Sequence, residues 1–363
     1  MASFKEKIAL GVSGGVDSSV AAMLLIDAGF DVEGIFMKNW EEDDSIDCNA
    51  KTDYKDASNV CKKLGIKINL VNFSDKYWND VFTRFINELK QGYTPNPDIF
   101  CNKEIKFKLF YDYALSIGFD SISTGHYAKT IRTSNTELHI PKDRIKDQTY
   151  FLYTLKEKIL NNIHFPLHNI DKKDVKNIAK DLNLGISEKK ESMGICFIGK
   201  KKFSSFIDEY IKPVGGSIVD YCTNKKIGTH NGLTKFTIGQ RKGIKIGGMK
   251  EANDSPWYVI DKDIHNNQLI VSQDQNPIYY DGKINLHDFN LINDNVDLNQ
   301  YFDVRFRHGG SLKKCKLIRN NNGYLIHLSD KERGIAAGQA AVLYNGTQCI
   351  GGGTVSSKCL NKN

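Results

Sequence analysis

The stretch from Leu10 to Leu25, LGVSGGVDSSVAAMLL, constrains the fold more than any other part of this 363-residue chain. An apolar strand runs into a glycine turn, and an apolar helix follows directly. Glycines in the turn let the backbone approach an anion without Cβ clashes. The free N–H groups of a helix that begins near Asp17 face the same turn. A glycine turn joined to a helix N-terminus predicts a phosphate-binding loop.

The residue types in the turn exclude the two commonest nucleotide loops. The stretch has no lysine of the GxxxxGK[ST] pattern, and its glycines are not spaced as GxGxxG. The serines add hydroxyl donors, and Asp17 is a candidate helix cap or magnesium ligand. We expect the anion to be bound by eight consecutive residues: Gly11, Val12, Ser13, Gly14, Gly15, Val16, Asp17 and Ser18.

Strand-like and helix-like segments alternate over the first 130 residues, which predicts a parallel sheet with helices on both faces. The expected strands are 7–12, 31–37, 66–73 and 120–126, and the expected helices are 18–29, 53–65, 76–92 and 102–118. Residues 131–200 are more basic, and we expect them to be mostly helical. From about residue 205, glycine and β-formers prevail, and Asn-Gly pairs indicate hairpins. The predicted α/β organisation is a Rossmann-like nucleotide-binding domain with a helical insert (1–204), a glycine-rich β domain (205–275) and a β-barrel (276–363).

Charge and cysteine spacing limit the classes of partner. The net charge of +7 permits a polyanionic partner such as RNA without requiring one. None of the eight cysteines has CxxC spacing, so we expect no metal site and no structural disulfide framework. No apolar run is long enough for a membrane span, and only six residues precede the first predicted strand. We therefore expect a cytoplasmic protein without a membrane partner.

Two cysteines lie in sequence contexts that favour reactivity. Cys101 follows the stiff segment TPNPDIF, and Asn102 is a candidate cap of the next helix, whose dipole would favour a thiolate. Cys196 lies in ESMGICFIGKKKF, between glycines and ahead of three lysines. The alternative interpretation of either residue is a small buried apolar side chain.

The chain resembles the tRNA-specific 2-thiouridylases of the ATP pyrophosphatase superfamily. The motifs that carry the resemblance span nearly the whole chain and keep one order: SGGVDSS, FMKNWEEDD, TPNPDIFCNKEIKF, STGHYAK, KDQTYFL, ESMGICFIG, GTHNGLTKFTIGQRKGIKIGG and SPWYVIDKD. The resemblance implies that ATP, with Mg²⁺, adenylates the 2-carbonyl of the wobble uridine of tRNA. Sulfur then replaces that oxygen, with release of AMP and pyrophosphate. It also implies a sulfur-donor protein, either a cysteine desulfurase or a sulfur-relay protein.

By the same resemblance, Cys196 carries sulfur as a persulfide. Cys101 is its partner, as base, nucleophile or resolving thiol, in a transient disulfide. Met37 is expected to pack on adenine, and Gly125 to lie beside the nucleotide. Without the family match, Met37 is an ordinary core residue and Gly125 a turn glycine.

The resemblance also implies contacts with tRNA. Asn96, Pro97 and Asp98 are expected to contact the target base; their alternative is a rigid turn. Further contacts are expected from Lys146, Asp147 and Gln148; the alternative interpretation of these three residues is the N-terminal turn of a helix. Contacts are also expected from Arg305 and Phe306, whose alternative interpretation is an exposed strand face. Two other functions remain open from the sequence. One is another ATP pyrophosphatase, such as a small-metabolite synthetase or a tRNA lysidine synthetase. The other is a tRNA-binding module without catalysis.

Overall fold

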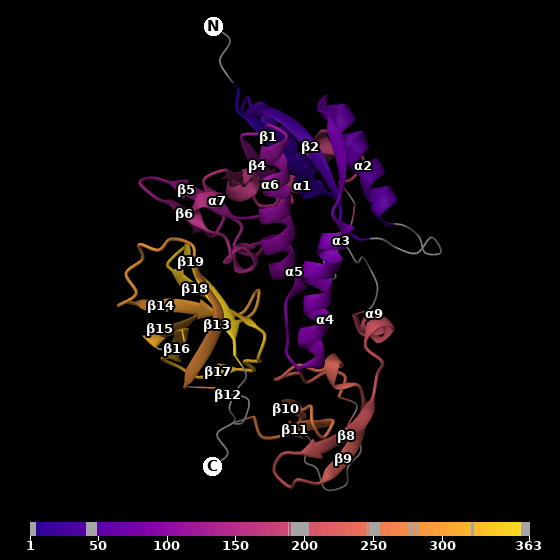
Figure 1. Ribbon diagram of the computed structural model, residues 1–363, viewed down its shortest axis with the longest axis vertical. Helices are drawn as coiled ribbons and strands as arrows, with labels where there is room; N and C mark the ends of the chain where they lie inside the picture. Colours follow the sequence, from indigo (N-terminus) through magenta and orange to yellow (C-terminus); the bar gives the residue numbers. More distant parts are fainter. Residues whose placement is uncertain are drawn as a thin grey trace.

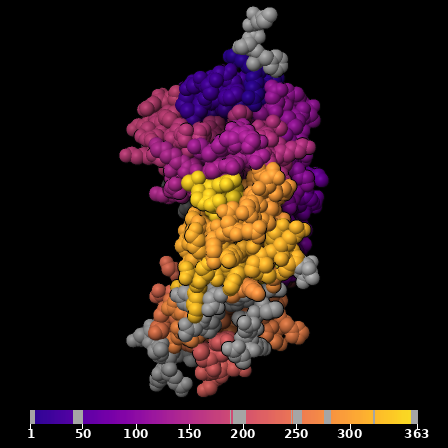
Figure 2. Space-filling view, turned by 90° about the vertical axis from the view of Figure 1, so that its left-hand side faces the viewer, coloured from indigo at the N-terminus to yellow at the C-terminus, as the bar shows by residue number. Residues whose placement is uncertain are grey.

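The computed structural model describes residues 5–40, 49–187, 189, 203–244, 246, 255–275, 279–280, 282–320 and 323–356. Three parts follow one another along the chain: an α/β domain, a central β domain and a β-barrel (Figure 1). In the space-filling view the barrel lies between the α/β domain and the central domain, and the molecule is elongated (Figure 2).

A five-stranded parallel sheet forms the centre of the α/β domain, in the order β3-β2-β1-β4-β7. Its strands are β1 (Lys7–Val12), β2 (Asp31–Lys38), β3 (Ile68–Asn72), β4 (Ser121–Thr124) and β7 (Ile163–His164). The sheet grows in one direction from β1 to β3 and then resumes on the other side of β1 with β4. The carboxyl ends of β1 and β4 therefore form the switch point at which open α/β sheets bind ligands.

The inner strands β1, β2 and β4 are largely buried, as their apolar sequences predicted. The edge strand β3 is partly exposed, with Leu70 48% exposed, which differs from the buried strand expected there. Ile8, Leu10 and Val12 pack in one cluster with α1, α2 and α8, whereas Ala9 packs in another with α4 and α6. The α-helices of the domain are α1 (Val16–Asp27), α2 (Asn49–Leu64), α3 (Ser74–Tyr77), α4 (Thr83–Lys90), α5 (Pro97–Phe100), α6 (Phe110–Ser116), α7 (Glu157–Leu160) and α8 (Lys172–Asp181). Two π-helical segments, Trp78–Phe82 and Cys101–Leu109, join α3 to α4 and α5 to α6.

The central domain begins after α9 (Phe203–Tyr210) and contains a four-stranded sheet in the order β10-β11-β8-β9. Its strands are β8 (Gly215–Asp220), β9 (Lys226–Asn231), β10 (Tyr258–Asp263) and β11 (Gln268–Ser272). A short pair, β12 (Tyr279–Tyr280) with β17 (Glu332–Arg333), connects this part of the chain to the barrel.

Six antiparallel strands form the barrel, which is closed by the pairing of β13 with β19. They are β13 (Lys283–Leu291), β14 (Tyr301–Arg305), β15 (Lys313–Asn320), β16 (Gly323–Leu328), β18 (Ala340–Asn345) and β19 (Gln348–Val355). Two of the Asn-Gly pairs belong to hairpins as predicted, since β15 pairs with β16 and β18 with β19. A third, at 231–232, is followed by a 3-10 turn. Closure of the barrel leaves few open strand edges.

The segment after residue 130 differs from the helical insert expected there. Residues 129–139 form a hairpin of β5 (Lys129–Arg132) and β6 (Thr136–His139), and β6 pairs with β19 of the barrel. Residues 141–156 contain one short 3-10 turn, Thr149–Phe151, instead of a helix. Longer helical structure is confirmed at α8. The hairpin thus joins the α/β domain to the barrel through backbone hydrogen bonds.

Candidate functional site

The glycine turn lies between the end of β1 and the start of α1, at the switch point of the sheet. Gly14 has φ +69°, a left-handed conformation that glycine adopts without strain. A Cβ built on Gly14 would lie 2.2 Å from the carbonyl oxygen of Asp53. Glycine is therefore required twice at this position, by the backbone conformation and by the approach of α2.

The first turn of α1 keeps its backbone donors available. Gly15 is the N-cap and provides no capping side chain. The Ser18 and Ser19 hydroxyls both donate to the Gly15 carbonyl, at 3.2 and 2.8 Å, and Ser18 Oγ also accepts from the Ser13 N–H. These bonds fix the turn without capping the N–H groups of the helix. Such a helix end attracts an anion.

Gly125, at the end of β4, lies against this same helix end. A Cβ on Gly125 would lie 2.8 Å from the Ser18 nitrogen. The chain that leaves β4 therefore packs directly against the first turn of α1. Met37, at the end of β2, lies over Gly11, where a Cβ would meet Met37 Cε at 3.1 Å. The Met37 side chain is buried, and its contact with adenine stays a prediction.

Asp17 does not cap α1, contrary to one of the two roles considered for it. It is the second residue of the helix, and both carboxylate oxygens accept from Lys172 Nζ, at 2.6 and 2.7 Å. The Tyr127 hydroxyl donates to the same carboxylate at 2.9 Å. Within the described residues no group of three acidic, histidine or cysteine side chains could hold a metal ion by itself, so a magnesium ligand at Asp17 stays a prediction.

A second lysine contacts the turn itself. Lys189 Nζ donates to the Gly14 carbonyl at 3.0 Å, to Asp53 at 2.8 Å and to Asp56 at 2.6 Å. Burial lowers the pKa of Lys189, but the hydrogen bonds and charges of the two aspartates outweigh burial and raise it. Lys172 and Lys189 thus tie the loop and the first turn of α1 to other parts of the domain, with their charges balanced by Asp17, Asp53 and Asp56.

Asn96, Pro97 and Asp98 begin a helix. The Asn96 side chain accepts a hydrogen bond from the Asp98 N–H at 3.0 Å, and Pro97 occupies the first helical position. The three residues are half-buried. The helix cap is therefore Asn96, and not Asn102 as predicted. The Asn102 amide donates to the Phe151 carbonyl at 3.2 Å.

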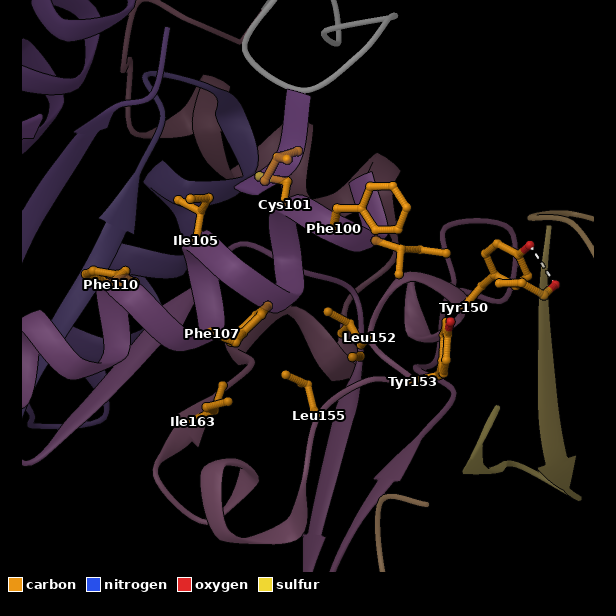
Figure 3. Packing of buried hydrophobic residues seen from close by; sticks show 14 of the residues in the cluster. Phe100, Cys101, Ile105, Phe107, Phe110, Tyr150, Leu152, Tyr153, Leu155 and Ile163 are labelled. Carbon is orange, nitrogen blue, oxygen red and sulfur yellow. Dashed lines mark hydrogen bonds between the residues drawn. The ribbon is translucent and has the colours of Figure 1, made fainter. Parts of the chain in front are cut away.

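Cys101 lies inside this helix instead of ahead of it. It is the fifth helical residue, at the start of the π-helical segment, and its side chain is buried among Phe100, Ile105 and Phe107 (Figure 3). The predicted position ahead of a helix N-terminus is therefore wrong, and the alternative of a buried side chain is confirmed. π-Helical segments are rare and often lie at functional sites. Cys196 lies outside the described residues, so its distance from Cys101 is not defined.

Two groups of predicted tRNA contacts, residues 146–148 and residues 305–306, lie next to each other in the structure. Arg305 Nη1 donates to the Asp147 carboxylate at 2.8 Å, and the Gln148 side chain accepts from the Tyr127 N–H at 2.8 Å. Phe306 packs in the barrel core with 4% of its surface exposed. The side chains of Asp147 and Phe306 are buried, so the alternative of an exposed strand face is wrong for Phe306. Contact of these residues with tRNA stays a prediction. Lys146 remains partly exposed.

Sequence reasoning missed Lys172, Lys189 and Tyr127. Each is far from the glycine turn in sequence, and no local pattern distinguishes the two lysines from their many neighbours of the same type. Tyr127 carries a signal, since it directly follows the STGH segment that supplies Gly125.

An uncapped helix end, a left-handed glycine and a sheet switch point are typical of a nucleotide-binding α/β domain. Three family models match the chain: "tRNA methyl transferase HUP domain" over residues 6–200, "tRNA methyl transferase PRC-barrel domain" over 204–273 and "Aminomethyltransferase beta-barrel domain" over 281–355. The proteins named "tRNA-specific 2-thiouridylase MnmA" from Pseudomonas entomophila and Hahella chejuensis are 44% and 43% identical to it. Each match covers 97% of this chain, with 95% and 98% of the respective relative.

The chain belongs to the tRNA-specific 2-thiouridylase family. Among solved structures, the "U34-tRNA thiolase NcsA from Methanococcus maripaludis" matches 56% of this chain and 64% of its own, with a TM-score of 0.35 and 20% identity. None of the helices in the described part of the chain has the length and apolarity of a membrane span.

Proposed function

We propose that the chain is an ATP-dependent sulfurtransferase that replaces the 2-carbonyl oxygen of the wobble uridine of tRNA with sulfur. The observation that carries the proposal is the match to curated 2-thiouridylases over 97% of the chain, with the glycine turn retained at the switch point. The alternative of a small-metabolite synthetase or a lysidine synthetase accounts for the turn alone. It leaves the central domain and the barrel without a role.

ATP fits the turn by its polyphosphate. The β- and γ-phosphates would lie at the uncapped N-terminus of α1, where the backbone packs too closely around Gly14 and Gly125 for a side chain at either position. Backbone N–H groups held in place stabilise the charge that develops on departing pyrophosphate. Lys189 and Lys172 would hold these N–H groups in place through their hydrogen bonds with the Gly14 carbonyl and the Asp17 carboxylate.

The reaction has two displacements. The uridine 2-carbonyl oxygen attacks the α-phosphorus, the bond to the β-phosphate oxygen breaks, and pyrophosphate leaves. A persulfide on Cys196 then attacks C2, and AMP leaves with the former carbonyl oxygen. Attack of a second thiol on Cys196 Sγ breaks the S–S bond, leaves sulfur on the base and forms a disulfide that an external thiol must reduce.

Cys101 is the proposed second thiol, as base, nucleophile or resolving group. Asn96, Pro97 and Asp98, three to five residues ahead of it, are proposed to contact the extruded base, with Pro97 and the Asn96 cap holding the segment rigid. Mg²⁺, a sulfur-donor protein and tRNA contacts by Lys146, Gln148 and Arg305 are further parts of the proposal. Extrusion of a base costs least in a single-stranded anticodon loop.

The test is thiolation of tRNA by the purified chain with ATP and a persulfide source, measured by mass spectrometry of nucleosides. Cys101→Ser and Cys196→Ser are expected to abolish 2-thiouridine while ATP binding persists. Cys222→Ser, which changes an exposed cysteine of the central domain, is the matched control and should retain full activity. AMP release that is indifferent to tRNA would favour the small-metabolite alternative and contradict the proposal.

A further inference from the structure

A pocket with three arginines lies at the seam between the central domain and the barrel. Its volume is about 380 Å³. In Figure 1 the seam lies where β10 and β17 approach each other, at the lower end of the barrel. The central domain and the barrel each supply three lining residues: Gly239, Arg241 and Tyr258 from the former, and Arg307, Arg333 and Gly334 from the latter.

The lining carries an excess of positive charge. No acidic side chain is among the lining residues. Among the described residues, Arg307 pairs with Glu332, which accepts from it at 2.9 Å and lies 3.5 Å from Lys313. One buried carboxylate is thus shared by two cations, while Arg241 and Arg333 add two more charges. A pocket of this composition attracts an anion.

Two of the guanidinium groups are held in position. Arg333 lies over the ring of Tyr258, 4.4 Å from its centroid, and Tyr258 is buried. Stacking on an aromatic face leaves the N–H edge of the guanidinium available. Arg307 Nη2 donates to the Arg333 carbonyl at 2.9 Å, in addition to its bond with Glu332. Little side-chain entropy remains to be lost when an anion binds.

The pocket adjoins the segment that contacts the α/β domain. Arg305 pairs with Asp147, and His308 Nε2 lies 2.9 Å from the Asp147 carbonyl oxygen, so Arg307 lies between two residues that contact the Lys146–Gln148 segment. A strand of RNA that follows this segment would continue to the pocket. Arg307 is half exposed and Arg241 is exposed, which suits a ligand that stays partly in solvent, such as a polymer backbone.

We propose that this pocket binds a backbone phosphate of the tRNA. Arginine forks pair with phosphate through two parallel hydrogen bonds, and such contacts fix the register of RNA on a protein. The inference rests on the proposed function, because it takes tRNA as the substrate. It assigns to the central domain and the barrel a joint role in holding that substrate.

The experiment measures the dissociation constant of tRNA over salt concentrations from about 0.05 to 0.3 M, where each phosphate contact contributes about 0.7–0.9 to the slope of log K against log salt. Arg241→Gln removes a charge that has no ion pair among the described residues. It is expected to weaken binding roughly fivefold and to reduce the slope by about 0.7–0.9. Arg333→Gln should do the same, whereas Arg333→Lys should keep the slope. Lys62→Gln, on the exposed face of α2, is the control for loss of one charge and should change neither quantity.

Affinity and slope of Arg241→Gln equal to those of Lys62→Gln would overturn the inference. Calorimetry with inorganic phosphate distinguishes a small-anion site. Phosphate binding that is lost in Arg241→Gln, with an unchanged tRNA slope, would also overturn it. Thiolation is measured separately: a chain that binds tRNA with the expected slope but makes no thiouridine contradicts the proposed function and leaves the pocket assigned. A wild-type chain without affinity for tRNA contradicts both.

Discussion

Asp147 and Arg305, 158 residues apart in sequence, form a buried ion pair of 2.8 Å between the α/β domain and the barrel. The Asp147 carboxylate also accepts from the Thr149 N–H and hydroxyl, and the Arg305 guanidinium lies 5.2 Å from the ring centroid of Tyr344. Two residues expected to contact tRNA therefore satisfy each other. Their side chains hold the barrel against the domain that binds the nucleotide.

Asp147→Asn tests this structural role. The amide keeps the shape and one acceptor, but it leaves the Arg305 charge buried without its partner, and such a loss costs about 3 kcal/mol of unfolding free energy. Urea unfolding measures the change. Lys314→Gln, which breaks an exposed pair with Asp303 in the same barrel, should cost less than about 1 kcal/mol. Unchanged stability of Asp147→Asn, together with weakened tRNA binding, would assign the side chain to the RNA instead.

Gly14→Ala is expected to abolish ATP binding. Its left-handed conformation costs about 1–2 kcal/mol for a non-glycine residue, and its Cβ would also collide with the Asp53 carbonyl at 2.2 Å. Gly118→Ala is the matched control, since Gly118 has φ +91° and no atom within 4 Å of a built Cβ. It should show the conformational cost without loss of nucleotide. Equal ATP affinity of the two variants, measured by calorimetry, would remove the turn from the nucleotide site.

The sequence was informative where function depends on backbone conformation. The role of the glycines in the turn and at position 125 can be predicted from the sequence, because few other residues fit a left-handed turn or a close approach of two backbone segments. The sequence Asn96-Pro97 also indicates a helix start, because proline favours the first helical position. The cap was instead expected at Asn102. The hairpin at 129–139 differs from the helix expected there, because its two strands are too short for the sequence to show a clear alternation of polar and apolar residues. Lys172 and Lys189 could not be found, since long-range pairing of one lysine among many leaves no local pattern.

Gly338→Ala should impair catalysis more than nucleotide binding. Gly338 has φ +85°, and a Cβ there would lie 2.8 Å from Tyr93 Cβ and 2.9 Å from the Thr94 nitrogen. The Thr94 N–H donates to the Ala337 carbonyl at 2.8 Å, so the barrel contacts the segment that precedes Asn96. Displacement of that segment is expected to lower kcat for thiolation at least tenfold, because misplacement of about 1 Å costs a hundredfold. The control is Gly346→Ala, also at positive φ but with an open surrounding. Loss of ATP affinity in Gly338→Ala would indicate general unfolding instead.

His126 predicts a loss of stability in mild acid. Its Nδ1 lies 2.7 Å from Thr124 Oγ1, between the rings of Phe107 and Phe165. Burial, and in second place the charge of Lys106, lowers the pKa of His126 well below its usual value. The folded state therefore holds the neutral ring while the unfolded state takes up a proton. The stabilisation is complete above about pH 6.5 and is lost as the pH falls toward the lowered pKa, by about 1.4 kcal/mol per pH unit.

Urea unfolding at pH 7.5 and pH 5.5 should show that His126→Gln loses less stability between these values than the wild type. His287→Gln, at an exposed histidine of β13, is the control and should follow the wild type; identical pH dependence of all three chains would mean that His126 titrates alike in the folded and unfolded states.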